Sequence, residues 1–317
     1  MLKRSASTQH ITVCTLWEND FHKGVGTLVN SLTRVGFNGK VWAGYRGDLP
    51  LWVGKKVSDG ERHTISATQA IEVIFVRLTT TVHFSQYKAQ WMMRVFSELD
   101  PDAAGIYYFD PDMLILGEWG FFEQWIQYGL ALCEDGSYPL NPTHPLVRGW
   151  QKYAAHLGYS DWQFGGTQFN SGLLGVAREF EGFLPIWQNV MESVRRDFKI
   201  IESLKTGLRT DLFYATDQDA LTLAASVAPF PVSWVGPDGM AFDRGEWLTI
   251  HAYSHKPWRR RVLRDLLVDG QKPDSALRLY WKLAGGPLQI ETTARIRSHR
   301  WLIPIAALLG RFYHRSG

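Results

Sequence analysis

The sequence predicts an α/β fold with a mostly parallel central sheet, and three observations carry that prediction. Apolar runs alternate with segments of helical periodicity, which is the order expected of strands joined by crossover helices. Polar and acidic residues follow the ends of several runs, where open α/β sheets bind their ligands. The chain of 317 residues is 45% hydrophobic, which is enough for a large core and excludes a disordered chain.

The first half of the chain contains the clearest alternation. A buried strand is followed by a polar turn and a helix, and two further strands precede a second helix that leads to the most apolar strand. The expected elements are, in order, a strand at 11–16, a turn at 18–20, a helix at 25–32, strands at 40–45 and 72–78, a helix at 87–99 and a strand at 105–115.

The second half is expected to complete the sheet and to add a loop-rich insertion at 136–166. A long irregular segment inside a compact domain is usually functional. The other expected elements are a strand at 129–133, a strand at 169–176, helices at 181–205 and 218–226, a last core strand at 247–251 and a loop at 251–258.

The stretch from Gly105 to Ile115 leads an apolar strand into two carboxylates, Asp110 and Asp112. Alternate residues of a strand project to the same side, so the two carboxylates can share one site. Pro111 between them has no N–H for a strand ladder, so the strand must break there or move to an edge. Two hard oxygen ligands at a strand end suit Mg²⁺ or Mn²⁺, and an ordinary surface turn is the alternative interpretation.

Composition and charge indicate the compartment in which the protein is expected to work. Cys14 and Cys133 both fall in expected strands, which predicts a reducing cytoplasm rather than a disulfide framework. The polar start at residues 1–10 argues against a secretory leader, and no run approaches the ~20 apolar residues that cross a bilayer. The net charge of +3 is uneven, because residues 259–317 contain 12 Lys or Arg and only 4 Asp or Glu.

Four ordered segments resemble one enzyme family: IYYFDPDMLI at 106–115, FNSGLLGV at 169–176, TDQDAL at 216–221 and HAYSHKPW at 251–258. Their order and approximate spacing resemble retaining glycosyltransferases of GT-A fold, in the family that includes glycogenin and bacterial lipopolysaccharide galactosyl- and glucosyltransferases. This resemblance implies a Rossmann-like single domain that binds a nucleotide sugar. The catalytic domain is expected at 1–258, with a basic helical C-terminal extension at 259–317.

The resemblance implies a metal site that binds the donor diphosphate. Asp110, Asp112 and His251 are the implied ligands of Mn²⁺ or Mg²⁺, although a lone His at a strand end is more often a hydrogen-bonded core residue. Lys256 matches the lysine that contacts the diphosphate in these enzymes. The segment between His251 and Lys256 is shorter than is usual in the family.

The resemblance also implies a site for the donor sugar and the catalytic centre. Asp217 is expected to hydrogen-bond sugar hydroxyls and Gln218 to lie near the anomeric carbon, and these two residues and Lys256 are the implied catalytic residues. Asn170 is expected to contact the sugar, and Gly172 to allow close approach of the backbone. From the residues alone, Asp217 can equally be a helix cap, and the Asn170 segment a tight turn.

The nucleotide is expected to bind at the first strand. Leu16, Glu18 and Asp20 align with the nucleotide-binding turn of the family, with Glu18 and Asp20 meeting the base and ribose. A basic residue before the metal motif is expected to contact donor phosphate or sugar. Lys88 and Arg94 are the two candidates, and Lys88 is the preferred one.

Together these features predict a retaining hexosyltransferase that uses a UDP-sugar and a glycan or lipid-linked glycan acceptor, with the insertion at 136–166 facing the acceptor. The alternatives are a phosphohydrolase of haloacid-dehalogenase type and a nucleotide-sugar-binding protein without transferase activity. Basic residues flank an apolar run at 295–309, which indicates either an anchor on an anionic membrane or a basic helix packed on the domain. We therefore expect a cytoplasmic protein at the inner membrane surface, and no nucleic-acid partner.

Overall fold

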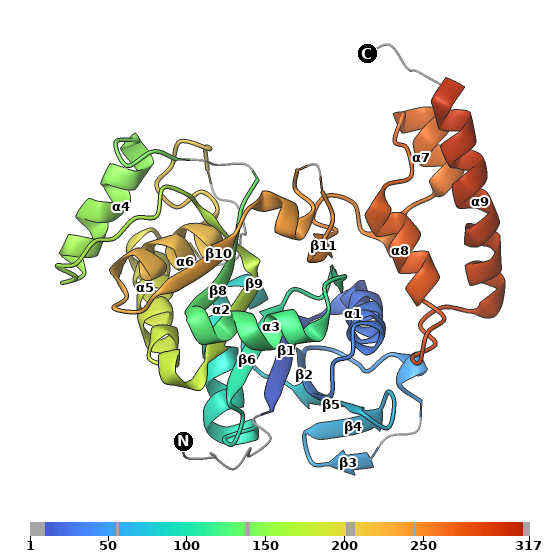
Figure 1. Ribbon diagram of the computed structural model, residues 1–317, viewed down its shortest axis with the longest axis horizontal. Coiled ribbons are helices and arrows are strands. Elements are labelled where there is room, and N and C mark those ends of the chain that lie inside the picture. Colours follow the sequence, from blue (N-terminus) through green and yellow to red (C-terminus); the bar gives the residue numbers. More distant parts are fainter. Residues whose placement is uncertain (1–9, 55–56, 137–139, 201–206, 244, 313–317) are drawn as a thin grey trace, which may run out of the picture.

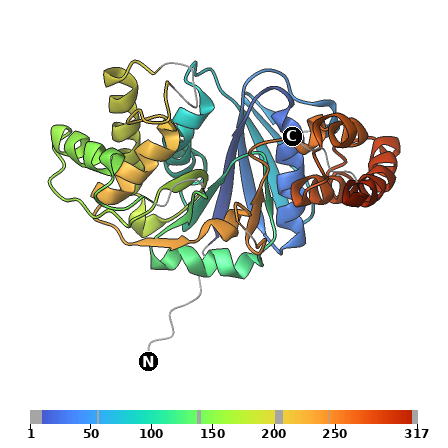
Figure 2. The ribbon, with the colours of Figure 1, turned by 90° about the horizontal axis from the view of Figure 1, so that it is seen from above.

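The computed structural model describes residues 10–54, 57–136, 140–200, 207–243 and 245–312. Within these residues a large sheet is flanked by helices on both faces (Figures 1 and 2). The strands are β1 (Ile11–Trp17), β2 (Gly39–Tyr45), β3 (Val57–Asp59), β4 (Arg62–Ser66), β5 (Ile71–Arg77), β6 (Gly105–Phe109), β7 (Met113–Ile115), β8 (Leu130–Glu134), β9 (Phe169–Ala177), β10 (Val232–Val235) and β11 (Thr249–His251). The helices are α1 (His22–Arg34), α2 (Phe84–Arg94), α3 (Trp119–Trp125), α4 (Pro145–His156), α5 (Phe183–Asp197), α6 (Thr216–Val227), α7 (Val262–Asp269), α8 (Ser275–Leu283) and α9 (Thr293–Phe312).

Nine of the described strands form one sheet in the order β10-β8-β9-β6-β1-β2-β5-β4-β3. Strand β1 pairs in parallel with β2 and β6, β2 pairs in parallel with β5, and β8 pairs in parallel with β10. Only β9 and β4 run against this common direction, since each pairs antiparallel with its neighbours. The predicted α/β class with a mostly parallel sheet is confirmed.

The central strands are apolar throughout because both faces of the sheet are covered. In β1, Val13 packs in one hydrophobic core with residues of α1 and α3, and the next residue, Cys14, packs in another with residues of α2, α5 and α6. Strand β6 repeats the pattern, with Tyr107 in the first core and Tyr108 in the second. A doubly covered strand reads as a continuous apolar run, which explains why the sequence located these strands correctly.

Pro111 ends the central strand, as its missing N–H predicts. Strand β6 stops at Phe109, and the chain resumes at Met113 as β7, which leaves the large sheet and pairs antiparallel with β11. The last strand expected at 247–251 is present as β11, but it pairs only with β7 among the described strands and so does not extend the large sheet. This register places His251 opposite Met113 and so beside the two carboxylates.

The expectation that 136–166 is irregular was wrong for its middle part, which forms α4. Pro145 is the first residue of that helix, where its fixed φ suits the helix and its missing N–H is not needed. The side chain of His144 accepts a hydrogen bond from the Leu146 N–H and so caps the helix. Proline here begins a helix rather than excluding one. The expected helix at 181–205 ends at Asp197, and part of its expected C-terminal end lies outside the described residues.

Helices α7, α8 and α9 form a separate hydrophobic cluster that lies beside α1 (Figure 1). Asn30 of α1 is buried and joins the two parts. Its Nδ2 donates to the carbonyl oxygens of Leu283 and Leu288, each at 2.8 Å, and its Oδ1 accepts from the Leu288 N–H at 2.9 Å. Lys23 of the same helix pairs with Glu291 at 2.8 Å. No described helix is long and apolar enough to cross a membrane.

Replacing Asn30 by alanine is expected to lower the free energy of unfolding by about 2–4 kcal/mol, since three buried backbone groups lose their partner. Urea denaturation of the full chain measures the change. Asn38→Ala is the matched control, because Asn38 is exposed. Equal stability of the two variants would contradict the role of Asn30.

Candidate functional site

A cavity of about 550 Å³ lies at the carboxyl ends of β1 and β6, where the predicted residues converge. The start of α6, the turn after β6 and the loop after β11 complete its walls. The predicted residues that line it are Leu16, Glu18, Lys88, Asp110, Asp112, Asn170, Asp217, Gln218, His251 and Lys256.

Asp110, Asp112 and His251 form a compact group in this cavity. Each offers a ligand atom, and these atoms lie within 4.8 Å of one another. His251 Nε2 is 3.4 Å from Asp112 Oδ1 and 3.9 Å from Asp110 Oδ2. Two carboxylates and an imidazole that face one point can hold a divalent metal ion.

Gly172 leaves room for this group. Its carbonyl oxygen accepts the Asp110 N–H at 2.8 Å, so the backbone of β9 passes directly behind the carboxylate. A Cβ atom at position 172 would lie 2.9 Å from His251 Cε1 and 3.0 Å from Asp110 Oδ2. Any larger residue would therefore push against two of the three candidate ligands.

Lys88 lies buried behind the carboxylates. Its Nζ is 2.9 Å from Asp110 and 3.5 Å from Asp217, and it donates to the Ser171 carbonyl oxygen at 3.0 Å. Burial alone would lower the pKa of Lys88, but Asp110 and Asp217 hold it above its ordinary value. Lys88 is therefore a fixed positive charge. Arg94, the other candidate, pairs with Glu98 and does not line the cavity.

Lys256 lies beside the group formed by Asp110, Asp112 and His251. Its ammonium group pairs with Asp112 and donates to the carbonyl oxygens of Ala252 at 2.8 Å and Tyr253 at 3.1 Å. Burial alone would raise the pKa of Asp112, but His251 and Lys256 hold it below its ordinary value. Asp112 is therefore a carboxylate at neutral pH.

Asp135 is a site residue that the sequence analysis missed. Its Oδ2 accepts from Asn170 Nδ2 at 2.8 Å and from Gln218 Nε2 at 2.9 Å, so one carboxylate positions both amides. Ser171, also missed, donates to Asp217 at 2.5 Å. The available signal for Asp135 was its place just after an expected strand, the same position that singled out Asp110.

Asp20 does not join the other predicted residues. Its carboxylate accepts from Trp258 Nε1 at 3.0 Å and pairs with Arg259, and it does not line the cavity. Leu16 and Glu18 do line it, and Glu18 pairs with Arg46 at 2.8 Å. The structure thus places Asp20 at the junction with the C-terminal helices.

No protein-family model and no curated protein sequence matches the chain. Among solved structures, it is similar to the WbbM bifunctional glycosyltransferase in its apo form, with a TM-score of 0.52 and 12% identity over 93% of this chain and 52% of that one. It is also similar to the glycosyltransferase GlyE of Streptococcus pneumoniae TIGR4, with a TM-score of 0.50 and 13% identity over 94% of this chain and 64% of that one. The chain has the GT-A glycosyltransferase fold. It spans about half of the first of these two proteins and under two thirds of the second.

The GT-A fold accounts for the position of the cavity. Open α/β sheets bind ligands outside the carboxyl ends of their strands, and the cavity lies at those ends of β1 and β6. At such low identity the likeness concerns the fold alone, so the roles of individual residues must be argued from the site itself.

Proposed function

We propose that the protein is a metal-dependent retaining glycosyltransferase that moves a hexose from a nucleotide sugar, most simply a UDP-hexose, to a glycan or lipid-linked glycan. The convergence of Asp110, Asp112 and His251 with two lysines in one cavity of a GT-A sheet carries the proposal. The cavity volume of about 550 Å³ falls in the range of about 300–1,000 Å³ of small-molecule sites. The two structural neighbours, both named as glycosyltransferases, support it.

In this proposal Asp110, Asp112 and His251 hold Mn²⁺ or Mg²⁺. Carboxylates suit both ions, and Mg²⁺ in particular prefers oxygen ligands to nitrogen. The bound ion would neutralise charge on the diphosphate as the nucleotide leaves. Lys256 already reaches Asp112 from a loop, so a modest side-chain movement would bring its ammonium group to the diphosphate.

The residues at the start of α6 are proposed to hold the sugar. Asp217 would accept from sugar hydroxyls, while Asn170 and Gln218, both positioned by Asp135, would lie at the reacting face. Retention then follows from attack on the face that the nucleotide leaves, with the leaving phosphate accepting the acceptor proton. Positioning and charge stabilisation would supply most of the rate.

The experiment is a thermal-shift screen of nucleotide sugars with Mn²⁺, followed by a transfer assay with the best donor. UDP-hexoses are expected to stabilise the protein most, against GDP-sugars and UDP-N-acetylhexosamines as comparisons. NMR of the product gives the anomeric configuration, and an inverted product would contradict retention. Trapping of an aspartyl-phosphate analogue with fluoroberyllate would favour a phosphohydrolase, and donor binding without hydrolysis or transfer would favour a binding protein.

Gly172→Ala is expected to weaken Mn²⁺ binding by at least ~10-fold, because the new methyl group must displace His251 or Asp110 by a few tenths of an ångström. Calorimetric titration with Mn²⁺ measures this without any donor. Gly165→Ala is the matched control, since a Cβ there meets no atom within 4 Å. Unchanged Mn²⁺ affinity in the Gly172 variant would exclude Asp110, Asp112 and His251 as the metal site.

We also propose that residues 1–258 form the catalytic domain and 259–317 an extension, in a protein that works on the cytoplasmic side of the inner membrane. The separate hydrophobic cluster of α7, α8 and α9 supports that division. The acceptor would then be a lipid-linked glycan held at an anionic membrane surface.

A further inference from the structure

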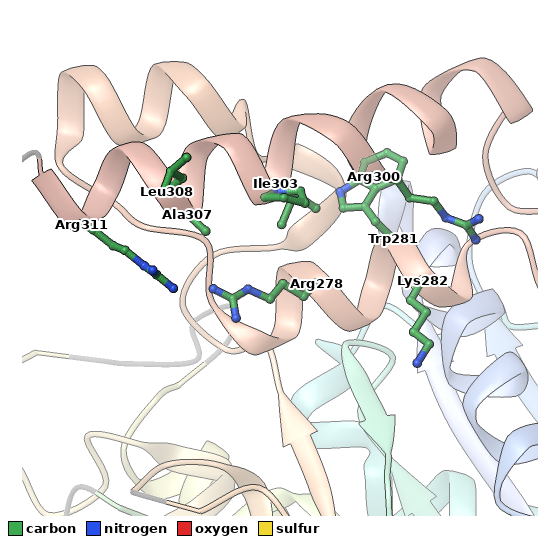
Figure 3. Close-up of a pocket in the computed structure, with 9 residues that line it drawn as sticks. Arg278, Trp281, Lys282, Arg300, Ile303, Ala307, Leu308 and Arg311 are labelled. Atoms are coloured by element: carbon green, nitrogen blue, oxygen red, sulfur yellow. The ribbon is translucent and has the colours of Figure 1, made fainter.

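A second hollow of about 620 Å³ lies between α8 and α9 and shares no residue with the catalytic cavity. We call it the cationic groove. Its cationic side chains are Arg278, Lys282, Arg300 and Arg311, and none of its lining residues is acidic. The side chains of Arg278 and Arg311 point toward the space between the two helices (Figure 3). The remaining lining residues are apolar: Trp281, Ile303, Pro304, Ala307 and Leu308.

The four cations of the groove have no carboxylate partner among the described residues. Two other arginines of this region do have carboxylate partners: Arg260 pairs with Asp265 and Asp274, and Arg295 pairs with Glu291. Four like charges around one apolar hollow repel one another and attract an anion. Arginine is suited to phosphate in particular, because its planar group can donate two hydrogen bonds to one phosphate.

Helix α9 is apolar on two opposite faces. Its inner face packs in the C-terminal cluster through Ile303 and Ala306. On the outer face, four large apolar side chains are exposed at spacings of four, three and four residues, which places them on one stripe. They are Trp301 at 75%, Ile305 at 47%, Leu308 at 55% and Phe312 at 82% exposure.

We propose that the C-terminal extension binds the surface of a bilayer that contains anionic phospholipids, with the outer stripe of α9 in the interface and a lipid phosphate in the cationic groove. Leu308 belongs both to the stripe and to the groove, so the two features are contiguous. An apolar stripe flanked by arginines is the pattern of a helix that lies in the membrane interface. Membrane binding through the C-terminal extension would bring the catalytic domain to a lipid-linked acceptor. Only this consequence rests on the proposed function.

The test is co-sedimentation of the full chain with vesicles of phosphatidylcholine alone or mixed with phosphatidylglycerol. Binding is expected to be much stronger with the anionic mixture than with phosphatidylcholine alone. Arg300→Glu/Arg311→Glu should lower the partition coefficient by at least ~10-fold, because each cation near an anionic surface contributes several-fold. The matched control, Arg148→Glu/Lys152→Glu, makes the same charge change at exposed positions of α4, at the opposite end of the molecule (Figure 1), and should bind like the wild type.

The apolar stripe is tested separately with Trp301→Ser/Phe312→Ser. This variant should lose the binding that persists at high salt, where charge attraction is screened. Circular dichroism and thermal unfolding establish that each variant is folded. Unchanged binding of the groove variant, equal loss in the α4 control, or equal binding to neutral vesicles would overturn the proposal. The assay uses no donor or acceptor, so its failure would leave the transferase proposal standing, and absence of transfer would not affect the vesicle result.

Discussion

Replacing Asp112 by asparagine is expected to lower metal-dependent glycosyl transfer by at least ~100-fold, since one of the two charged side chains proposed to bind the metal ion is lost. The change is nearly isosteric, so it tests charge rather than packing. In the wild type, Asp112 faces His251 with one oxygen and pairs with Lys256 through the other. An asparagine amide cannot balance the Lys256 ammonium, and its NH₂ group would be directed at one of these two neighbours.

The measurement is the rate of donor hydrolysis and transfer over a titration of Mn²⁺. Asp102→Asn is the control, because Asp102 is exposed in the loop before β6. It should retain wild-type rates and wild-type Mn²⁺ dependence. Full activity in the Asp112 variant would exclude the metal assignment, whereas a higher Mn²⁺ requirement with an equal limiting rate would restrict Asp112 to binding the ion.

The depressed pKa of Asp112 also predicts how the stability effect of this variant depends on pH. A carboxylate whose pKa is lowered by folding stabilises the protein above its ordinary pKa of about 3.9, and this contribution is lost as the pH falls through the folded value. The stability difference between the wild type and Asp112→Asn should therefore be largest near neutrality and should shrink below about pH 4. Urea denaturation from pH 3 to pH 7 measures this stability difference. A difference that grows on acidification would contradict the conclusion that Asp112 is charged at neutral pH.

The fold was predictable where local pattern and burial agree. Strands β1 and β6 are covered on both faces, so their apolar runs stand out in the sequence. Strand β10 and the hairpin of β3 and β4 escaped notice, because they are short and partly exposed and so lack a strong apolar signal. The pairing of β7 with β11 depends on residues over 130 positions apart, a contact that no local pattern reports.

In the candidate site too, some residues were evident from the local sequence and others only from contacts between distant parts of the chain. Asp110 and Asp112 flank a single proline at the end of a strand, so the local sequence was sufficient to single them out as candidates. Asp135 lies at the same sheet edge but belongs to none of the matched segments. Asp20 lies in the expected nucleotide-binding turn, yet Arg259, from the far end of the chain, pairs with its carboxylate. This ion pair becomes visible only when the C-terminal part of the chain is packed against the first turn.

Lys88→Met is expected to lower the free energy of unfolding by about 3–5 kcal/mol, which is the usual cost of removing one partner from a buried ion pair. Methionine keeps most of the side-chain volume, so the loss reports on charge. Without the ammonium group, Asp110 and Asp217 lose the buried cation between them, and the Ser171 carbonyl oxygen loses a donor. Lys152→Met, at an exposed position of α4, is the control and should change stability by less than about 0.5 kcal/mol.

Two further measurements separate the charge of Lys88 from its packing. Adding Asp217→Asn to Lys88→Met removes one of the two uncompensated carboxylates, so the double variant should be more stable than the sum of the single changes predicts. The pKa of Lys88 is raised by folding, so its contribution is complete below its ordinary pKa of about 10.4 and is lost only as the pH rises through the folded value. The stability difference between the wild type and Lys88→Met should therefore stay constant from pH 6 to pH 9. Strict additivity with Asp217→Asn would mean that the charge of Lys88 does not act on Asp217, and its ion pair with Asp110 would then account for the electrostatic part of the loss.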